Sequence, residues 1–318
     1  MTVAAGQRTP DFFIVGHHKC GTTALYEMLR GHPQIYMPEC KEPKFLATDL
    51  PARREPSAAR MLPRTLAEYL ALFAPAEPGQ RAGEASPQYL RSRTAARRIA
   101  ELRPDARIVA ILREPASFLR SLHLQLVENH VERERDLRRA LARDEREDGE
   151  GGDGAARRGV RYSEHVRYVE QLRRFHAVFP REQVLVLIYD DFRADNAGTV
   201  RRVLRFLGVD DTVRLAPREA NPSVRVRSPR LDDAVHALYA GRGPGTRALK
   251  RGARLLVPRR ARRGALRAVR RGVAYGAPEP PDEQLMDELR RRYRDEVHAV
   301  SEYLGRDLVE LWGYGGLG

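Results

Sequence analysis

The sequence predicts an α/β fold in which a parallel sheet is flanked by helices. Three short apolar runs typical of buried strands, at residues 12–15, 108–112 and 184–188, alternate with stretches of helical periodicity. This alternation favours parallel strands covered on both faces. With 318 residues, 42% of them hydrophobic, the chain can build a sizeable core, and we expect a single domain over residues 1–318.

The elements follow one another in a regular order. The first strand ends at Gly16 and leads through a tight polar loop into a helix that Gly31 and Pro33 stop. Pro115 suits the first turn of the helix that follows the second strand. Apolar spacing of three and four residues predicts further helices at 66–73, 94–102, 162–178, 200–207 and 281–312, the last ending in a terminal turn.

Two charged segments depart from this pattern. Residues 132–158 are a mixed charge run that ends in glycines, and we interpret them as a flexible surface connection. Residues 234–278 contain many arginines and no acidic residue, and we interpret them as a basic helical insertion.

The overall charge is strongly positive. The chain has 57 basic and 43 acidic residues, a net charge of +14, which favours polyanionic partners. The two cysteines, Cys20 and Cys40, cannot form a disulfide framework, and the chain shows neither a signal-peptide pattern nor an apolar run of membrane-spanning length. We therefore expect a cytoplasmic protein.

The loop from Gly16 to Thr23, with the sequence GHHKCGTT, is the most informative stretch. Between a strand and a helix, free backbone N–H groups and the positive helix end form a pocket for an anion, and glycines let the backbone approach it closely. Thr22 and Thr23 add hydroxyl donors, and Lys19 adds a mobile charge. The nucleotide-binding P-loop needs Gly-Lys-[Ser/Thr] at its end, whereas Gly21 is followed here by Thr22, which argues against nucleoside triphosphate chemistry.

Further motifs occur in order along most of the chain. They are HPQIYMP at 32–38, KEPKFL at 41–46, GEASPQYL at 83–90, IVAILREP at 108–115 with Ser121 eight residues after Arg113, FPREQVLV at 179–186, and FLGV at 206–209. Together with the loop, they resemble the sulfotransferases that use 3′-phosphoadenylyl sulfate (PAPS), and most closely the bacterial and glycan-type branch with a glutamate base. The resemblance implies a P-loop-like sulfotransferase fold and PAPS as the donor substrate, without a metal.

The resemblance also implies roles for individual residues. Lys19 would bind the phosphosulfate and act catalytically, and Glu42 would be the general base, for which we expect burial to raise its pKa. Arg113 and Ser121 would hold the 3′-phosphate. The remaining residues of the implied phosphosulfate-binding loop are Cys20, Gly21, Thr22 and Thr23.

Several residues keep two interpretations. Glu42 could instead be an ordinary carboxylate paired with Lys41 or Lys44, and Lys41 either orients the acceptor or is solvated. Cys20 either carries a stabilised thiolate at the helix N-terminus or fills a small-residue position. The same ambiguity, between a site role and a structural role, applies to His18, His130, Tyr162, Arg225, Arg227 and Arg230.

The acceptor is not specified by the sequence. Relatives that act on polysaccharides often carry Lys where this chain has Ala85, which weakens the case for a glycosaminoglycan and leaves a small metabolite, a glycan or a lipid-linked molecule. The basic amphipathic residues 242–271 either cover the acceptor cleft or contact an anionic membrane surface, and we expect no nucleic acid. The rival functions are a P-loop nucleotide kinase or NTPase and a non-catalytic polybasic phosphate- or membrane-binding protein.

Overall fold

The computed structural model describes residues 6–50, 62–149, 160–216, 225–226, 275–276 and 279–316. The chain divides into two compact units. The first contains residues 1–119, 161–221 and 283–318, and the second contains residues 120–160 and 222–282.

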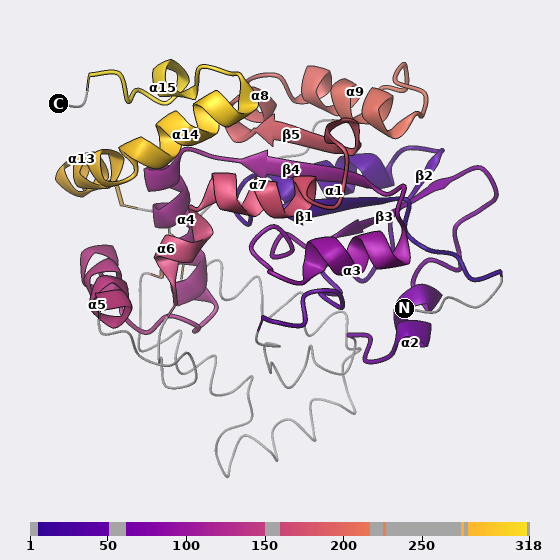
Figure 1. The fold of residues 1–318 in the computed structure, drawn as a ribbon, viewed down its shortest axis with the longest axis horizontal. Helices are drawn as coiled ribbons and strands as arrows, with labels where there is room; N and C mark the ends of the chain where they lie inside the picture. Colours follow the sequence, from indigo (N-terminus) through magenta and orange to yellow (C-terminus); the bar gives the residue numbers. More distant parts are fainter. Residues whose placement is uncertain are drawn as a thin grey trace, which may run out of the picture. The chain divides into compact units, whose positions relative to one another are not determined.

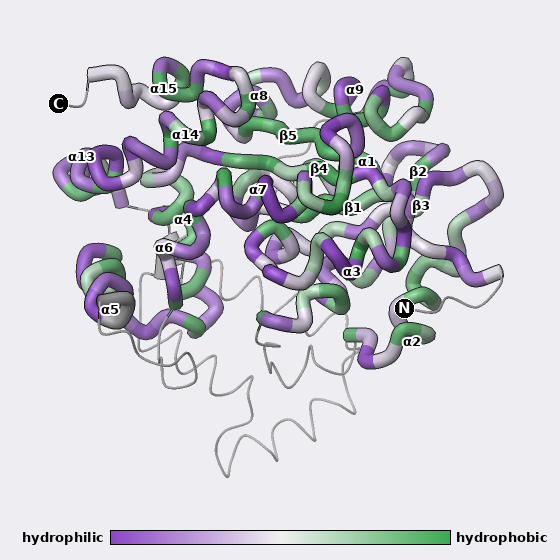
Figure 2. The backbone as a smooth tube through the Cα atoms, in the orientation of Figure 1, coloured by the Kyte–Doolittle hydropathy of each residue, from purple (hydrophilic) through white to green (hydrophobic). Residues whose placement is uncertain are grey.

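A parallel sheet of five strands forms the centre of the first unit, in the order β2-β3-β1-β4-β5, which confirms the predicted parallel sheet. The three predicted apolar runs are β1, β4 and β5, and Figure 2 shows β4 and β5 as strongly hydrophobic segments. The strands β2 and β3 were not expected. Neither has a long apolar run, because β2 is two residues long and β3 is built from Arg, Ala, Gly, Glu and Ala. The strand bounds are Phe12–Gly16 (β1), Ile35–Tyr36 (β2), Arg81–Ala85 (β3), Arg107–Leu112 (β4) and Val184–Ile188 (β5).

Helices cover both faces of this sheet (Figure 1). Helices α1 and α9 pack together on one face, and α3 and α7 pack together on the other. Each presents an apolar side to the sheet, as in α3, where Ile99 is fully buried and Leu102 nearly so. The bounds are Thr22–Arg30 (α1), Ala95–Leu102 (α3), Tyr168–His176 (α7) and Asn196–Leu207 (α9), with the short helices α2 (Leu66–Ala71) and α8 (Tyr189–Ala194) beside them.

The helices that follow the neighbouring strands β1 and β3 lie on opposite faces of the sheet. From β1 the chain passes through α1 to β2 at one edge of the sheet, whereas from β3 it passes through α3 to β4 on the other side of β1. Ligands of open parallel sheets bind where the strand order reverses in this way. The register between β1 and β4 shifts between Ile14 and Gly16, at the start of the glycine loop.

Two predicted helices are interrupted. The stretch 162–178 forms α6 (Tyr162–His165) and α7, and the stretch 281–312 forms α13 (Glu283–Arg292), α14 (Arg294–Leu304) and α15 (Leu308–Leu311). Gly305 ends α14 in a left-handed conformation with φ 62°, which a glycine adopts without strain. No helix in the described part of the chain combines the length and the apolar character needed to cross a membrane.

The second unit corrects one expectation. Residues 132–158 are not a flexible connection throughout, because Leu137–Gly149 form helix α5. Ahead of it, the carboxylate of Glu132 is buried and pairs with Arg143 at 2.5 Å, which fixes the segment between α4 (Pro115–Glu128) and α5. A short antiparallel pair, β6 (Arg225–Val226) and β7 (Tyr275–Gly276), belongs to the same unit. The rest of the predicted basic insertion 234–278 lies outside the described residues.

Candidate functional site

The glycine loop joins β1 to α1 at the carboxyl edge of the sheet. Gly21 precedes α1 in a left-handed conformation with φ 84°, and no side chain caps this helix end. A Cβ at Gly21 would lie 2.8 Å from the Phe192 ring, and one at Gly16 would lie 2.6 Å from Leu90 Cβ, so both positions require glycine. The first N–H groups of α1 have no partner within the helix, and an anion at this helix end would accept hydrogen bonds from them.

Unusual backbone conformations gather around this loop. Lys19, Glu42 and Lys44 have φ values of 59°, 60° and 60°, and in the described part of the chain only one other non-glycine residue, His130, has a positive φ. The left-handed conformation costs a side-chain-bearing residue roughly 1–2 kcal/mol, and such strain concentrates at functional sites. Two of the three residues at this site, Lys19 and Glu42, are those that the sequence assigns to catalysis.

Glu42 lies beside the loop and contacts three basic side chains. Its Oε1 is 3.3 Å from Lys41 Nζ, and its Oε2 is 3.3 Å from Lys44 Nζ and 3.9 Å from His18 Nε2. Burial disfavours the charged carboxylate, but His18, Lys44 and Lys41 outweigh burial and lower the pKa of Glu42 to about 2. The expectation of a raised pKa is therefore wrong, because the two lysines, and His18 at the low pH where it is protonated, stabilise the charged carboxylate more than burial disfavours it.

Lys41 connects this carboxylate to the glycine loop. Its ammonium donates to Thr23 Oγ1 at 2.6 Å, in the first turn of α1, and also to Glu42 Oε1. Its side chain is only 20% exposed, so the interpretation of Lys41 as a solvated lysine is not supported.

The two loop histidines have different surroundings. His17 is buried behind the loop, where its Nε2 lies 2.6 Å from Gln171 Oε1, and burial lowers its pKa to about 3. His18 faces Glu42, and burial lowers its pKa to about 4 although the carboxylate opposes this effect. Both imidazoles are therefore neutral at pH 7, His17 as a packing group and His18 as a polar neighbour of the carboxylate.

Glu42 belongs to an irregular segment, residues 41–49, that is anchored at regular intervals to residues 85–94. The N–H of Glu42 donates to Ala85 O at 3.0 Å, and that of Lys44 donates to Ser86 Oγ at 3.1 Å. The N–H of Leu46 donates to Tyr89 OH at 3.2 Å. These bonds hold the segment without regular secondary structure.

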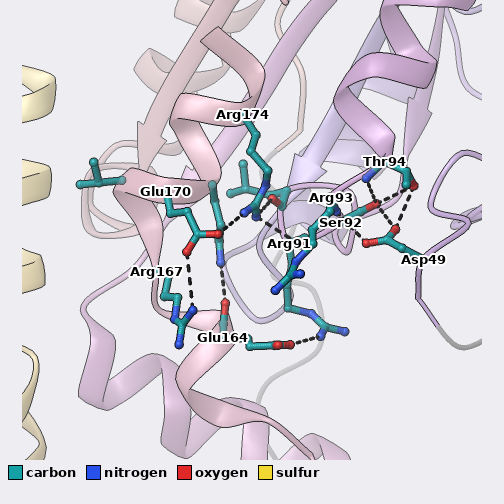
Figure 3. A network of polar contacts seen from close by, with 12 residues as sticks. Asp49, Arg91, Ser92, Arg93, Thr94, Glu164, Arg167, Glu170 and Arg174 are labelled. Carbon is teal, nitrogen blue, oxygen red and sulfur yellow. Dashed lines mark hydrogen bonds and ion pairs between the residues drawn. The ribbon is translucent and has the colours of Figure 1, made fainter. Parts of the chain in front are cut away.

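The far end of this segment is fixed by a polar network (Figure 3). Asp49 accepts hydrogen bonds from Ser92 Oγ, Arg93 N and Thr94 Oγ1 at 2.5–2.9 Å, at the start of α3. On the other side of the network, Arg91 pairs with Glu164. The segment that carries Glu42 is thus tied at both ends to the same stretch of chain.

A second carboxylate, which the sequence analysis missed, lies beneath this segment. Glu84 in β3 is fully buried, and its Oε2 accepts from Tyr69 OH at 2.5 Å and from Tyr89 OH at 3.1 Å. Burial raises its pKa to about 7, against the hydrogen bonds of Ser86, Tyr69 and Tyr89. Glu84 was overlooked because its strand lacks an apolar run, although it is part of the GEASPQYL motif.

Arg113 also reaches the glycine loop. It follows β4 directly, and its guanidinium donates to Lys19 O at 3.1 Å and to Ser117 Oγ at 3.0 Å. The same group lies 4.7 Å from the centre of the Tyr189 ring, a cation–π contact that fixes its orientation. Ser117 and Tyr189 were not anticipated. Ser121 lies in α4, is buried, and belongs to the second unit.

Some of the remaining predicted residues lie in the described part of the chain, and others do not. Cys20 is fully buried and burial raises its pKa to about 12, so the stabilised thiolate is wrong and the thiol is a packing group. Tyr162 is buried at the start of α6, and His130 lies in the turn after α4, two residues beyond Glu128. The residues 242–271, together with Arg227 and Arg230, lie outside the described residues, and of Arg225 only the backbone is described.

Within the described residues, no three or more His, Cys, Asp or Glu side chains are grouped as metal ligands would be. The site therefore offers the helix end, hydroxyls and cations toward an anionic ligand, next to one carboxylate that can accept a proton.

Comparison with known proteins finds similar sequences in one family. Residues 10–212 match the family model described as "Sulfotransferase family". The human protein named "Heparan sulfate glucosamine 3-O-sulfotransferase 6" is 30% identical over 207 residues, which is 65% of this chain and 54% of that protein. The human "Carbohydrate sulfotransferase 15" is 53% identical over 36 residues, 11% of this chain and 6% of that protein.

A solved structure of a protein described as a sulfotransferase is also similar to this chain. The sulfotransferase from Alicyclobacillus acidocaldarius superposes with a TM-score of 0.59 at 30% identity, covering 74% of this chain and 92% of that one. This chain spans about half the length of the first curated relatives that it matches.

Proposed function

The chain belongs to the sulfotransferase family, and from this premise we propose that it transfers a sulfuryl group from PAPS to an acceptor hydroxyl, with Glu42 as the general base. The observation that carries this proposal is the position of Glu42, which shares the ammonium of Lys41 with Thr23 of the glycine loop. A proton acceptor thus lies beside the anion-binding helix end. The name of the human relative, a 3-O-sulfotransferase, favours a hydroxyl over an amine.

The glycine loop and its neighbours fit the donor. The uncapped N–H groups at the start of α1, the hydroxyls of Thr22 and Thr23, and Lys19 would hold the phosphosulfate. Arg113, already oriented by Tyr189, would hold the 3′-phosphate, with Ser121 as a second donor. Cys20 and Gly21 would shape the loop, because the buried thiol fills it and Gly21 leaves room for Phe192.

When bound, PAPS supplies an activated sulfuryl group whose leaving group is a phosphate. Lys19 and the N–H groups of the α1 terminus would stabilise the charge that develops on this leaving group, and they would bind it more strongly in the transition state than in the ground state. Glu42 would accept the proton of the acceptor hydroxyl as the oxygen attacks. The loop thus lowers the barrier mainly through positioning and electrostatics.

The proposed acceptor is a hydroxyl of a small metabolite, a glycan or a lipid-linked molecule. Ala85 is buried, and its carbonyl accepts from Glu42 N, so this position offers no cation to a sulfated polysaccharide. We propose a cytoplasmic location for the reaction. A membrane contact through residues 242–271 stays a prediction, which co-sedimentation with anionic liposomes at low and high salt would test.

Two measurements test the proposal. Calorimetric titration should show binding of adenosine 3′,5′-bisphosphate and much weaker binding of ATP, since the loop lacks the Gly-Lys-[Ser/Thr] sequence. Glu42→Gln should lower kcat with PAPS by about 10²–10⁴-fold and leave bisphosphate affinity within a few-fold, as expected for the loss of a general base. Tight, magnesium-dependent ATP binding would instead support a nucleotide kinase. Unchanged turnover in Glu42→Gln would refute the role of Glu42.

A further inference from the structure

The Lys41 side chain lies between the proposed donor-binding loop and the proposed general base, Glu42. Its ammonium lies 2.6 Å from Thr23 Oγ1, on the side of the donor loop, and 3.3 Å from Glu42 Oε1, on the side of the base. It also lies 5.9 Å from the centre of the Tyr26 ring, one turn further along α1. One ammonium group therefore contacts both the first turn of α1 and the carboxylate.

The carboxylate in this arrangement is held too tightly to be an effective base. Both of its oxygens face positive or polar groups, Lys41 on Oε1 and the pair of Lys44 and His18 on Oε2. These groups lower the pKa of Glu42 to about 2, far from the operating pH at which a general base works best. At least one of these contacts has to weaken before Glu42 can take a proton efficiently.

Lys41 is better placed to release Glu42 than Lys44 is. The Lys44 backbone is fixed by its N–H bond to Ser86 Oγ, and within the described residues its ammonium has one ion-pair partner, Glu42. Lys41 already has a second partner in the donor loop. A phosphosulfate at the first turn of α1, which carries two negative charges in all, would compete with the singly charged Glu42 for the Lys41 ammonium, because Coulomb attraction grows with the charge of the partner.

We propose that Lys41 is a catalytic residue that changes its hydrogen-bond partner when the donor binds. Its ammonium moves from Glu42 Oε1 to an oxygen of the phosphosulfate that is held beside Thr23. This inference rests on the proposed function of the site. The freed Oε1 then takes the proton of the acceptor hydroxyl as the hydroxyl oxygen forms its bond to sulfur. The bond between sulfur and the bridging oxygen breaks, and its electron pair stays on the phosphate, where Lys41 offsets the new charge.

The partner change also orders the reaction. Before the donor binds, Glu42 is a paired carboxylate and a weak proton acceptor, so an acceptor that arrives first meets an inactive base. After the donor binds, the Lys41 ammonium contacts the leaving group and no longer contacts Glu42, so Glu42 becomes a stronger base. Donor binding and base strength are thus coupled through one side chain, and thermodynamic linkage requires that the coupling act in both directions.

The test measures the pKa of Glu42 directly, in addition to turnover. The carboxylate of Glu42 is followed by ¹³C NMR in protein labelled at glutamate, with Glu42→Gln identifying its signal, and titrated with and without saturating adenosine 3′,5′-bisphosphate. In the unmodified protein, this ligand should raise the pKa of Glu42 by at least about one unit. In Lys41→Met, the ligand-free pKa should already be higher, and the rise caused by the ligand should fall below half of that in the unmodified protein.

Lys44→Met is the matched control, because it also removes one cation from Glu42 and leaves the donor loop intact. It should raise the ligand-free pKa and keep the full rise caused by the ligand. In turnover with PAPS, Lys41→Met should lower kcat by about 10²-fold or more and Lys44→Met by less than tenfold.

The outcomes separate the two proposals. If the bisphosphate binds and the pKa of Glu42 does not move, or if Lys41→Met keeps the full ligand-induced rise, the partner change is refuted and the sulfotransferase site stands. If the bisphosphate does not bind at all, the proposed function fails, and the inference fails with it. Circular dichroism melts of both variants verify that they are folded.

Discussion

Two carboxylates beside or within the 41–49 segment, Glu42 and Glu84, have opposite electrostatic states, and we call their surroundings the ionic face and the tyrosine face. Glu42, on the ionic face with Lys41, Lys44 and His18, has a pKa lowered to about 2, whereas burial raises that of Glu84, on the tyrosine face, to about 7. One backbone hydrogen bond, from Glu42 N to Ala85 O, joins the two regions. Burial acts against the charge in both, so adjacent cations, and not depth, decide which carboxylate stays ionised.

We expect the two carboxylates to have different roles, Glu42 in catalysis and Glu84 in holding the segment in place. Glu42 is partly exposed and lies beside the glycine loop, where under the proposed function its charge would act on the substrates. Glu84 is closed off beneath it, and the tyrosine hydroxyls that it accepts from also hold the segment, since Tyr89 OH accepts the N–H of Leu46. We therefore expect substitutions on the ionic face to affect turnover and substitutions on the tyrosine face to affect stability first.

Substituting each carboxylate in turn should give the largest difference between the two faces, measured as the free energy of unfolding as the pH is lowered. Glu84→Ala leaves two buried tyrosine hydroxyls without their acceptor and opens a cavity, which should lower the free energy of unfolding by about 3 kcal/mol in urea denaturation. Glu42→Ala should also cost up to about 3 kcal/mol at pH 7, since a pKa lowered from 4.5 to about 2 corresponds to that much, but this cost should vanish as the pH falls toward 2. A cost of Glu42→Ala that stays as large at low pH as that of Glu84→Ala would show that the faces do not differ as described.

The pH dependence of stability should sharpen the same contrast. The pKa of Glu84 lies above its ordinary value of 4.5, so its contribution to stability is complete below pH 4.5 and is lost as the pH rises through about 7. Glu84→Gln stays neutral, and between pH 4.5 and 8 its free energy of unfolding should gain up to about 3 kcal/mol relative to the unmodified protein.

Glu42→Gln is the control for this titration. Because the pKa of Glu42 is lowered to about 2, its stabilising contribution is present above pH 4.5 and is lost only as the pH falls toward 2. The stability difference between Glu42→Gln and the unmodified protein should therefore be flat from pH 5 to 8. A difference for Glu84→Gln that is equally flat over this range would contradict the raised pKa of Glu84.

The smallest effect is expected where the two faces meet. Ser86→Ala removes the acceptor of the Lys44 N–H, which should cost about 1 kcal/mol of stability and lower kcat by less than tenfold with donor affinity unchanged. Ser86→Thr, which keeps the hydroxyl, should restore most of the activity. A loss of donor affinity in Ser86→Ala would indicate that the segment also shapes the glycine loop.

The sequence was enough to predict the parts of the proposed site that depend on local chemistry. Gly21, Thr22 and Thr23 follow a strand and begin a helix, and that order alone is enough to predict an anion-binding turn. The strands β1, β4 and β5 were equally clear, because each is a continuous apolar run. The strand β3 was hidden, since its inward residues are small or, like Glu84, polar, and only its neighbours in the sheet make it a strand.

The sequence by itself determined the parallel sheet, the glycine loop and the family of the protein, because each depends on residues that are close together along the chain. The tertiary structure alone decided the charge state of the groups. Segments far apart in sequence bring Lys41 to Thr23, His18 to Glu42 and Tyr69 to Glu84. A pKa depends on neighbours in space through burial and Coulomb interaction, and sequence spacing does not give those distances.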